Sequence, residues 1–428
     1  MLWLYRLLFL PVLIVSAPYY LARMRRRGGY GEKFSHRFGR HHRLPPKRRG
    51  IRRIWLQAVS VGEVLAIDPL IEAMTQDGSV EIYLTTTTST GYKLAYERYG
   101  KRVLGPGYFP VDWWSFSQAA WRAVSPDLVI LTEGERWPEH LEQARRRNVP
   151  VIAVNARLSD RSFQRLRRFT FARDAVLGGI TRWLPSSAQD EARFRELGVP
   201  AEKIRTTGNI KLDVCIEPLP ADERMRLKRE LGLGDEILLL GSSTWPGEEA
   251  ALVAAWKSVR ASGVPCGLLI VPRHAERRGE IEKLLIDAKV TFHFRSRGPA
   301  AGPVEVAVAD TTGELRRLTQ LADLAFIGKS LPPNEGGQTP VEAAALEKPL
   351  LFGPRMSNFR TIAAELRAEG AAREVADEAA LINEVGTLLQ NTPQREAMAA
   401  AAGRWHRSNA GAVDRTIEVI RGELAKLP

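Results

Sequence analysis

Cysteine is almost absent from this chain. Only two of its 428 residues are cysteines, Cys215 and Cys266, and each has apolar neighbours. Two such thiols exclude a disulfide scaffold and a cysteine-based metal site, so we expect a reducing, cytoplasmic setting. The length suffices for two domains with separate cores, and a hydrophobic share of 44% with 26% charged residues is typical of globular proteins.

Several nucleotide and metal motifs are also missing. The chain has no Asp-x-Asp pair, no His-x-x-x-His pair, no Walker loop and no Gly-x-Gly-x-x-Gly after a strand. These absences disfavour a metal-dependent phosphate site, an NTPase and a redox dinucleotide enzyme. We therefore expect no bound metal and no cofactor.

Acidic residues are nearly lacking at the amino-terminal end. The chain has 62 basic and 49 acidic residues, of which 14 and one lie in the first 60 positions, so the remainder carries 48 of each. A basic excess confined to one end, next to an apolar run, indicates attraction to anionic lipid headgroups rather than to nucleic acid.

That apolar run covers residues 1–22 and is followed by Arg23, Arg25, Arg26 and Arg27. A cleaved signal peptide carries its basic residues before the apolar run, so we expect an uncleaved anchor with the body held on the cytoplasmic side. About 20 apolar residues can cross a bilayer. Two prolines interrupt this run, however, and a helix lying in the membrane interface is an equal alternative.

The first half of the body alternates buried strands with polar loops and helices. Strands are predicted at 54–59, 80–84, 127–131 and 151–154. The ligand edge of a parallel sheet is where its strands end, which places Glu63, Glu133 and Glu135 there. Thr85–Thr88 are either a strand end or hydroxyl donors to a substrate. Lys211 falls where one domain passes to the next, a usual place for ligands.

The second half repeats this architecture after a proline-rich linker at 217–222. Arg273 follows a buried strand and suits a phosphate. The stretch from Gly336 to Glu342 predicts a loop whose glycines approach a ligand, with Thr339 as N-cap and Pro340 in the first turn of a phosphate-binding helix. A plain loop-to-helix turn is the alternative.

These motifs, in this order, resemble the 3-deoxy-D-manno-octulosonic acid (Kdo) transferases of glycosyltransferase family 30. The resemblance runs from the anchor to about Phe359. Its carriers are Ala58–Glu63, Thr86–Gly91, Glu133–Pro138, Asn155–Ser159, Gly208–Lys211, Val271–His274, Thr312–Glu314, Gly336–Glu342 and Gly353–Phe359.

The resemblance implies an α/β protein of the GT-B fold, with two Rossmann-like domains facing a central cleft and an N-terminal membrane-anchor helix. The predicted segments are an anchor with its basic flank (1–27), a basic linker (28–50), an acceptor-binding domain (51–215), a nucleotide-sugar-binding domain (216–405) and a last helix packing back on the first domain (406–428).

The resemblance also implies transfer of Kdo from CMP-Kdo to a lipid A precursor, with inversion and without a metal. Glu63 would be the general base, and Glu133 and Lys211 would stabilise the transition state. The residues implied to hold CMP are Pro272, Arg273, Thr312, Gly313, Glu314, Thr339, Pro340, Val341 and Glu342.

The second half departs from the family pattern at four places, which involve five residues. Gln338-Thr339 replaces His-Asn, Lys329 replaces a glycine, Thr312 replaces methionine, and Trp245 replaces histidine. These departures keep a second hypothesis open, a GT-B transferase with another nucleotide sugar or membrane acceptor. A third hypothesis is a non-catalytic lipid-surface binding protein.

Overall fold

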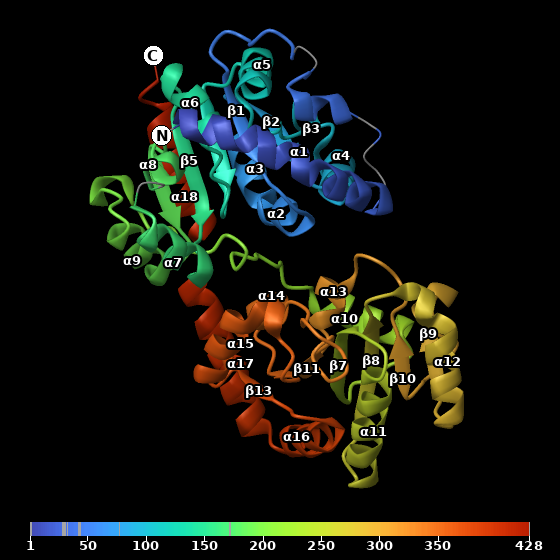
Figure 1. Ribbon diagram of the computed structural model, residues 1–428. Coiled ribbons are helices and arrows are strands. Elements are labelled where there is room, and N and C mark those ends of the chain that lie inside the picture. Colours follow the sequence, from blue (N-terminus) through green and yellow to red (C-terminus); the bar gives the residue numbers. More distant parts are fainter. Residues whose placement is uncertain are drawn as a thin grey trace. The chain divides into compact units, whose positions relative to one another are not determined.

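The computed structural model describes residues 2–27, 31, 33–41, 44–76, 78–170 and 173–427. The chain forms two compact units (Figure 1). Unit 1 comprises Met1–Asp213 together with Gly411–Pro428, and unit 2 comprises Val214–Ala410. The stretch expected as a basic linker, 28–50, lies partly outside the described residues.

Unit 1 is built on a six-stranded parallel sheet of order β3-β2-β1-β4-β5-β6. Its strands are β1 (Arg52–Gln57), β2 (Val80–Thr86), β3 (Pro106–Tyr108), β4 (Leu128–Thr132), β5 (Val151–Ala156) and β6 (Arg182–Pro185). The chain leaves β1 toward β2 on one side and reaches β4 on the other, so the strand order reverses between β1 and β4. Ligands bind at such a switch point in open α/β sheets.

Helices cover both faces of this sheet, which is why its strands are nearly continuously apolar. They are α1 (Leu2–Arg27), η1 (Phe34–Phe38), α2 (Val61–Ala66), α3 (Asp68–Thr75), α4 (Ser89–Tyr99), α5 (Trp114–Val124), α6 (Pro138–Arg146), α7 (Asp160–Arg168), α8 (Arg173–Leu177), α9 (Ala188–Glu196), η3 (Ala201–Lys203) and α18 (Ala412–Leu424). α1 continues through Pro11 and Pro18.

Unit 2 has a seven-stranded parallel sheet of order β13-β12-β11-β7-β8-β10-β9. Its strands are β7 (Ile237–Thr244), β8 (Cys266–Pro272), β9 (Phe292–Phe294), β10 (Val306–Val308), β11 (Leu324–Ile327), β12 (Leu350–Phe352) and β13 (Ala372–Glu374). Here the order reverses between β7 and β11.

The helices of unit 2 pack on the sheet around a large apolar cluster. They are α10 (Ala221–Glu230), α11 (Glu248–Ala261), η4 (Ala275–Arg277), α12 (Arg278–Asp287), η5 (Arg295–Arg297), α13 (Leu315–Thr319), α14 (Val341–Ala345), η6 (Ser357–Phe359), α15 (Arg360–Ala368), α16 (Glu378–Gln390) and α17 (Thr392–Asn409).

The carboxyl-terminal stretch is two helices. The segment predicted as a last helix, 406–428, contains the end of α17 and all of α18: α17 ends at Asn409 and α18 begins at Ala412, because Gly411 adopts a left-handed φ of 78°. α18 then packs on α3 and adds Ile417 and Ile420 to the core of unit 1. The chain therefore returns to unit 1 for its last helix.

The threonine run belongs mainly to β2. Thr85 and Thr86 are buried within the strand, and Thr85 donates a hydrogen bond to Gln57 Oε1 over 2.6 Å. Thr88 caps α4 by accepting from the N–H of Gly91. Thr87 Oγ1 accepts from Gln57 Nε2 over 3.1 Å, so all four threonines have partners within the protein, which favours the strand-end interpretation.

Candidate functional site

Glu63 lies at the switch point of unit 1. It sits in the first turn of α2, directly after β1, and is 9% exposed. Thr132, at the end of β4, donates a hydrogen bond of 2.6 Å to its Oε2, and the N–H of Val59 donates another of 3.0 Å. Burial raises the pKa of Glu63, while these two hydrogen bonds oppose the rise. The result is a fixed, partly desolvated carboxylate.

Glu133 and Lys211 form an ion pair beside Glu63. Glu133 follows β4 in a left-handed conformation with a φ of 52°, and its Oε1 pairs with Lys211 Nζ. Both side chains also act on the charge of Glu63: Glu133 raises its pKa and Lys211 lowers it. The structure therefore brings together the three residues expected to carry the chemistry, all within unit 1.

Glu135 is a second unusual carboxyl group on the same loop. Its Oε2 accepts a 2.6 Å hydrogen bond from Trp137 Nε1. Burial raises its pKa to about 7, and the nearby charge of Glu63 adds to the rise. The positive charge of the neighbouring Arg136 opposes this rise, and its guanidinium donates to the carbonyl of Arg157 over 3.5 Å.

Asn155 is a site feature that composition and spacing did not predict. It forms a bulge where β5 pairs with β6, with a φ of 53°, and it is 1% exposed. Neither its Oδ1 nor its Nδ2 has a hydrogen-bond partner among the described residues. Buried amides are normally satisfied, so this one marks a strained position at the ligand edge.

In unit 2, Pro272 ends β8 and Arg273 follows it. Pro272 is buried, whereas the Arg273 side chain is exposed. The N–H of Arg273 donates to the carbonyl of Thr244 over 3.1 Å, which fixes its backbone beside the end of β7. The guanidinium forms no ion pair within the described part of the chain, so it is available to an anion.

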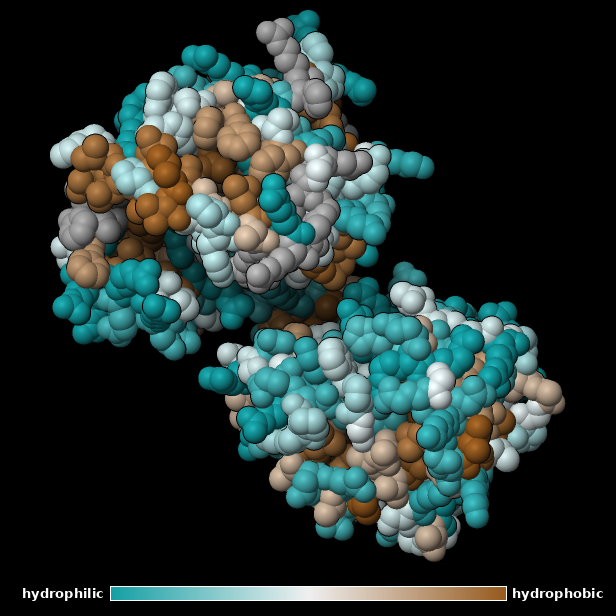
Figure 2. All heavy atoms as spheres, turned by 45° about the vertical axis from the view of Figure 1, so that its right-hand side comes forward, coloured by the Kyte–Doolittle hydropathy of each residue, from teal (hydrophilic) through white to brown (hydrophobic). Residues whose placement is uncertain are grey.

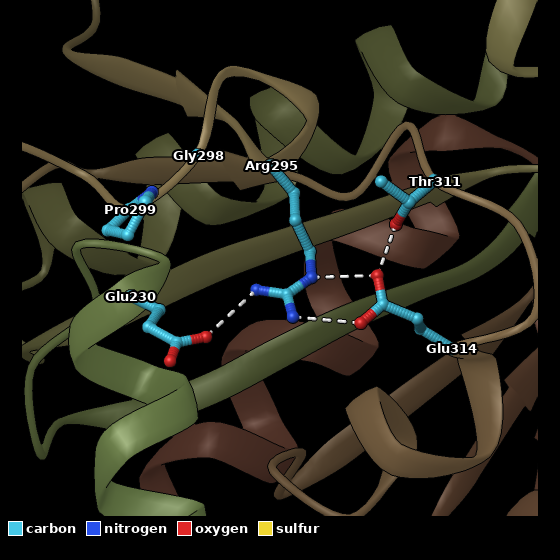
Figure 3. Close-up of a pocket in the computed structure, with 6 residues that line it drawn as sticks. All are labelled: Glu230, Arg295, Gly298, Pro299, Thr311 and Glu314. Atoms are coloured by element: carbon cyan, nitrogen blue, oxygen red, sulfur yellow. Dashed lines mark hydrogen bonds and ion pairs between the residues drawn. The ribbon is translucent and has the colours of Figure 1, made fainter.

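Thr312 and Gly313 are exposed, whereas Glu314 lines a small polar cavity of about 280 Å³ (Figure 3). Arg295 donates to both carboxylate oxygens of Glu314, at 2.7 and 2.8 Å, and lies 3.4 Å from Glu230. The Arg295 hydrogen bonds lower the pKa of Glu314. α13 begins after Glu314, which serves as its N-cap residue without a side-chain cap bond.

The Gly336 loop differs from its sequence-based interpretation. The N–H groups of Gly336, Gly337 and Gln338 donate to backbone carbonyls of the protein itself. A Cβ on Gly336 would lie 2.6 Å from Asn358 Nδ2, and one on Gly337 2.4 Å from Met356 Sδ. The glycines therefore admit the protein's own side chains.

The helix after this loop is also shorter than expected. α14 has five residues and its N-cap is Pro340, one position later than predicted. Thr339 Oγ1 accepts from the N–H of Val341 over 3.4 Å, and Val341 is buried. Glu342 accepts from Arg316 over 2.7 Å. So short a helix provides no strong dipole for a phosphate.

A buried carboxylate that the sequence did not single out holds the switch point of unit 2. Glu248, 1% exposed, accepts from the N–H groups of Trp245, Lys329, Ser330 and Leu331 at 2.8 to 3.1 Å. It thereby joins the loops after β7 and β11. Lys329 keeps a left-handed φ of 60°, with Nζ 4.5 Å from the centre of the Trp245 ring. Two of the four departures from the family pattern thus touch each other.

Comparison with known proteins identifies relatives of the chain. Residues 32–214 match the family model described as 3-Deoxy-D-manno-octulosonic-acid transferase (kdotransferase). The 3-deoxy-D-manno-octulosonic acid transferase of Bordetella pertussis is 33% identical over 93% of this chain and 94% of its own length. That of Haemophilus influenzae is 31% identical over 98% and 96%.

Solved structures agree on the fold. The UDP-GlcNAc 2-epimerase of Neisseria meningitidis, bound to UDP-GlcNAc, superposes with a TM-score of 0.56 at 13% identity, over 86% of this chain and 100% of its own. This likeness shows the paired Rossmann-like units of the GT-B fold. The relatives matched over nearly their full length show that the chain belongs to the 3-deoxy-D-manno-octulosonic acid transferase family of glycosyltransferases.

Proposed function

We propose that this protein transfers Kdo from CMP-Kdo to a lipid A precursor at the cytoplasmic face of the inner membrane, by a metal-independent, inverting displacement. The observation that carries the proposal is the arrangement around Glu63: a buried carboxylate at the switch point, beside a carboxylate–lysine pair, in a chain of this family.

In the proposed step, an acceptor hydroxyl oxygen attacks the anomeric carbon of Kdo as the bond from that carbon to the CMP phosphate oxygen breaks. The hydroxyl proton passes to Glu63, whose raised pKa makes it a better base than an exposed glutamate. The electron pair leaves with CMP. Lys211, held in place by Glu133, lowers the energy of the developing negative charge.

The CMP site is assigned to unit 2. Arg273 is the cation best placed for the phosphate, because it is exposed and follows β8 without an ion-pair partner in the described chain. Pro272, Thr312–Glu314 and Thr339–Glu342 would contact the rest of the nucleotide. Glu314 and Glu342 are already bound to Arg295 and Arg316, so we assign them to positioning these arginines as well.

A transfer assay tests the proposal directly. The full-length protein, CMP-Kdo and a lipid A precursor are combined in the presence of EDTA, the product is identified by mass spectrometry, and NMR gives its anomeric configuration. Glu63→Gln should fold, bind CMP with a Kd within about twofold of the wild type, and lose at least about 100-fold in transfer. The control is Glu72→Gln, the same change at an exposed residue of α3.

Transfer retained by Glu63→Gln removes Glu63 from the base role, and EDTA sensitivity removes metal independence. Another donor is the second candidate, favoured by the contact between Lys329 and Trp245, which both depart from the family pattern. A panel of CMP- and UDP-sugars with the same acceptor decides between the two.

A further inference from the structure

The start of α1 is docked on the body of unit 1. Tyr5 Oη donates to Asp112 Oδ2 over 2.7 Å, and the Arg6 guanidinium donates two hydrogen bonds of 2.9 Å to the two carboxylate oxygens of Glu139. One turn later, the ring of Phe9 stacks on Trp113 with centroids 6.2 Å apart. Three successive positions of one helix face thus have specific partners.

These partners are rigid parts of the folded unit. Glu139 has no exposed surface and also accepts a 2.9 Å hydrogen bond from Gln143. Asp112, 2% exposed, accepts from the N–H groups of Glu139 and His140 at the start of α6. If Arg6 left, Glu139 would lose the cation that pairs with it in the docked structure.

The opposite face of α1 is apolar and open. Leu2–Ala22 is long and apolar enough to cross a membrane. Trp3, Leu7, Ile14 and Val15 lie on the other side of the helix from Tyr5, Arg6 and Phe9 and are each 63 to 81% exposed. Apolar side chains also gather on the surface of unit 1 in Figure 2. An exposed apolar helix face of this length indicates contact with a membrane or with another protein.

The distribution of charge along the chain indicates what contacts this apolar face. The first 60 residues carry 14 basic residues and one acidic residue, whereas the rest of the chain is balanced. An apolar helix face next to a basic segment fits the boundary between anionic headgroups and acyl chains. A second copy of the chain would bring the same positive charge to the same place.

We propose that α1 stays docked on unit 1 in the membrane and lies in the plane of the bilayer surface, with its outward face in the lipid, instead of crossing the bilayer. A crossing helix would have to take Arg6 away from Glu139 and into or through the hydrocarbon, so docking and crossing exclude each other. The inference deepens the proposed function, because it defines how the enzyme meets a lipid acceptor.

Disulfide crosslinking in membranes tests the docking. The full-length protein carries Phe9→Cys and Trp113→Cys in a background with Cys215→Ser and Cys266→Ala, and oxidation is followed by mass spectrometry of isolated membranes. The expected result is an intramolecular disulfide between positions 9 and 113. Val15→Cys with Trp113→Cys is the matched control and should not crosslink, because Val15 is 81% exposed on the outer face.

A crosslink that forms in detergent but not in membranes would overturn the proposal, as would an intermolecular disulfide from Val15→Cys alone, which would identify a second copy as the partner of the apolar face. The side of the membrane on which residue 2 lies is an independent test. Leu2→Cys in cells with a permeabilised outer membrane should react with an impermeant maleimide only after lysis, as the exposed native Cys215 does. Labelling of position 2 alone before lysis means that the helix crosses.

Neither readout depends on catalysis. A docked helix in a protein that transfers no Kdo would overturn the proposed function and leave this inference standing. If the protein transfers Kdo and position 2 is labelled before lysis, this inference is wrong and the proposed function stands.

Discussion

Glu63 owes its electrostatic character to neighbours on three different segments. Burial and Glu133 raise its pKa, whereas Thr132, the Val59 N–H and Lys211 lower it. In the proposed reaction the base must be ionised, so the acid limb of the pH–rate profile reports this balance. Charges that do not touch the reacting proton can therefore move the limb.

The ion pair beside Glu63 gives a matched prediction. Lys211→Met removes a positive charge, so the acid limb of kcat/KM should shift to higher pH. Glu133→Gln removes a negative charge, so the limb should shift to lower pH. Both variants should also be slower than the wild type. Limbs that move together, or not at all, would show that the titrating group is not Glu63.

Glu135 predicts a pH dependence of stability. Its pKa rises from 4.5 to about 7 on folding, so the folded protein holds a proton that the unfolded chain releases between these pH values. The stability that this proton contributes is present below pH 4.5 and is lost as the pH rises through 7. The change in the free energy of unfolding caused by Glu135→Gln should therefore be more stabilising at pH 8 than at pH 5, by on the order of 1 kcal/mol.

Thermal unfolding at pH 5 and pH 8 measures this difference. Glu202→Gln, at an exposed carboxylate, is the control and should show no such change. A Glu135→Gln variant that follows the wild type at both pH values would mean that the folded protein does not raise this pKa.

At the scale of elements, the units of strand, loop and helix were predictable because buried parallel strands leave a clear apolar run. The carboxylates after β1 and β4 were placed correctly for the same reason. The internal contacts of the Gly336 loop are not predictable from its own sequence, because its partners Arg355, Met356 and Asn358 lie further along the chain. Glu248 and Asn155 were missed because no local pattern reveals a buried hydrogen-bond hub or an unpartnered amide.

α18 depends on one carboxylate for its attachment. Asp213 accepts from the N–H of Gly411 over 3.0 Å and of Val413 over 2.7 Å, at the point where the chain re-enters unit 1. Asp213→Ala should destabilise unit 1 by about 1–2 kcal/mol, the usual effect of losing a helix cap. Hydrogen exchange should show the loss first in α18.

Asp235→Ala, at an exposed loop carboxylate of unit 2, should leave exchange in α18 unchanged. If Asp213→Ala also leaves it unchanged, the other contacts of α18 suffice to hold it, namely apolar ones such as Ile417 and ion pairs such as Arg182–Glu423.

At the scale of the whole molecule, the excess of basic residues lies in a different part of the sequence from the residues proposed to react. The proposed reaction site carries buried carboxylates and single cations, whereas the basic excess lies in the first 60 residues. Apolar insertion of α1 is insensitive to salt, but attraction of its basic flank to anionic headgroups falls as ionic strength rises. The two contributions to membrane binding are therefore separable by experiment.

Replacing Arg23, Arg25, Arg26 and Arg27 with glutamine should weaken binding to phosphatidylglycerol vesicles, since each basic residue near an anionic surface contributes about 1 kcal/mol. Binding to phosphatidylcholine vesicles should not change, because the outward face of α1 is intact. Vesicle flotation at low and high salt measures both, and the wild type should approach the variant as salt increases. Equal losses on both lipids would mean that the arginines support the fold of the anchor rather than its attraction to anionic lipid.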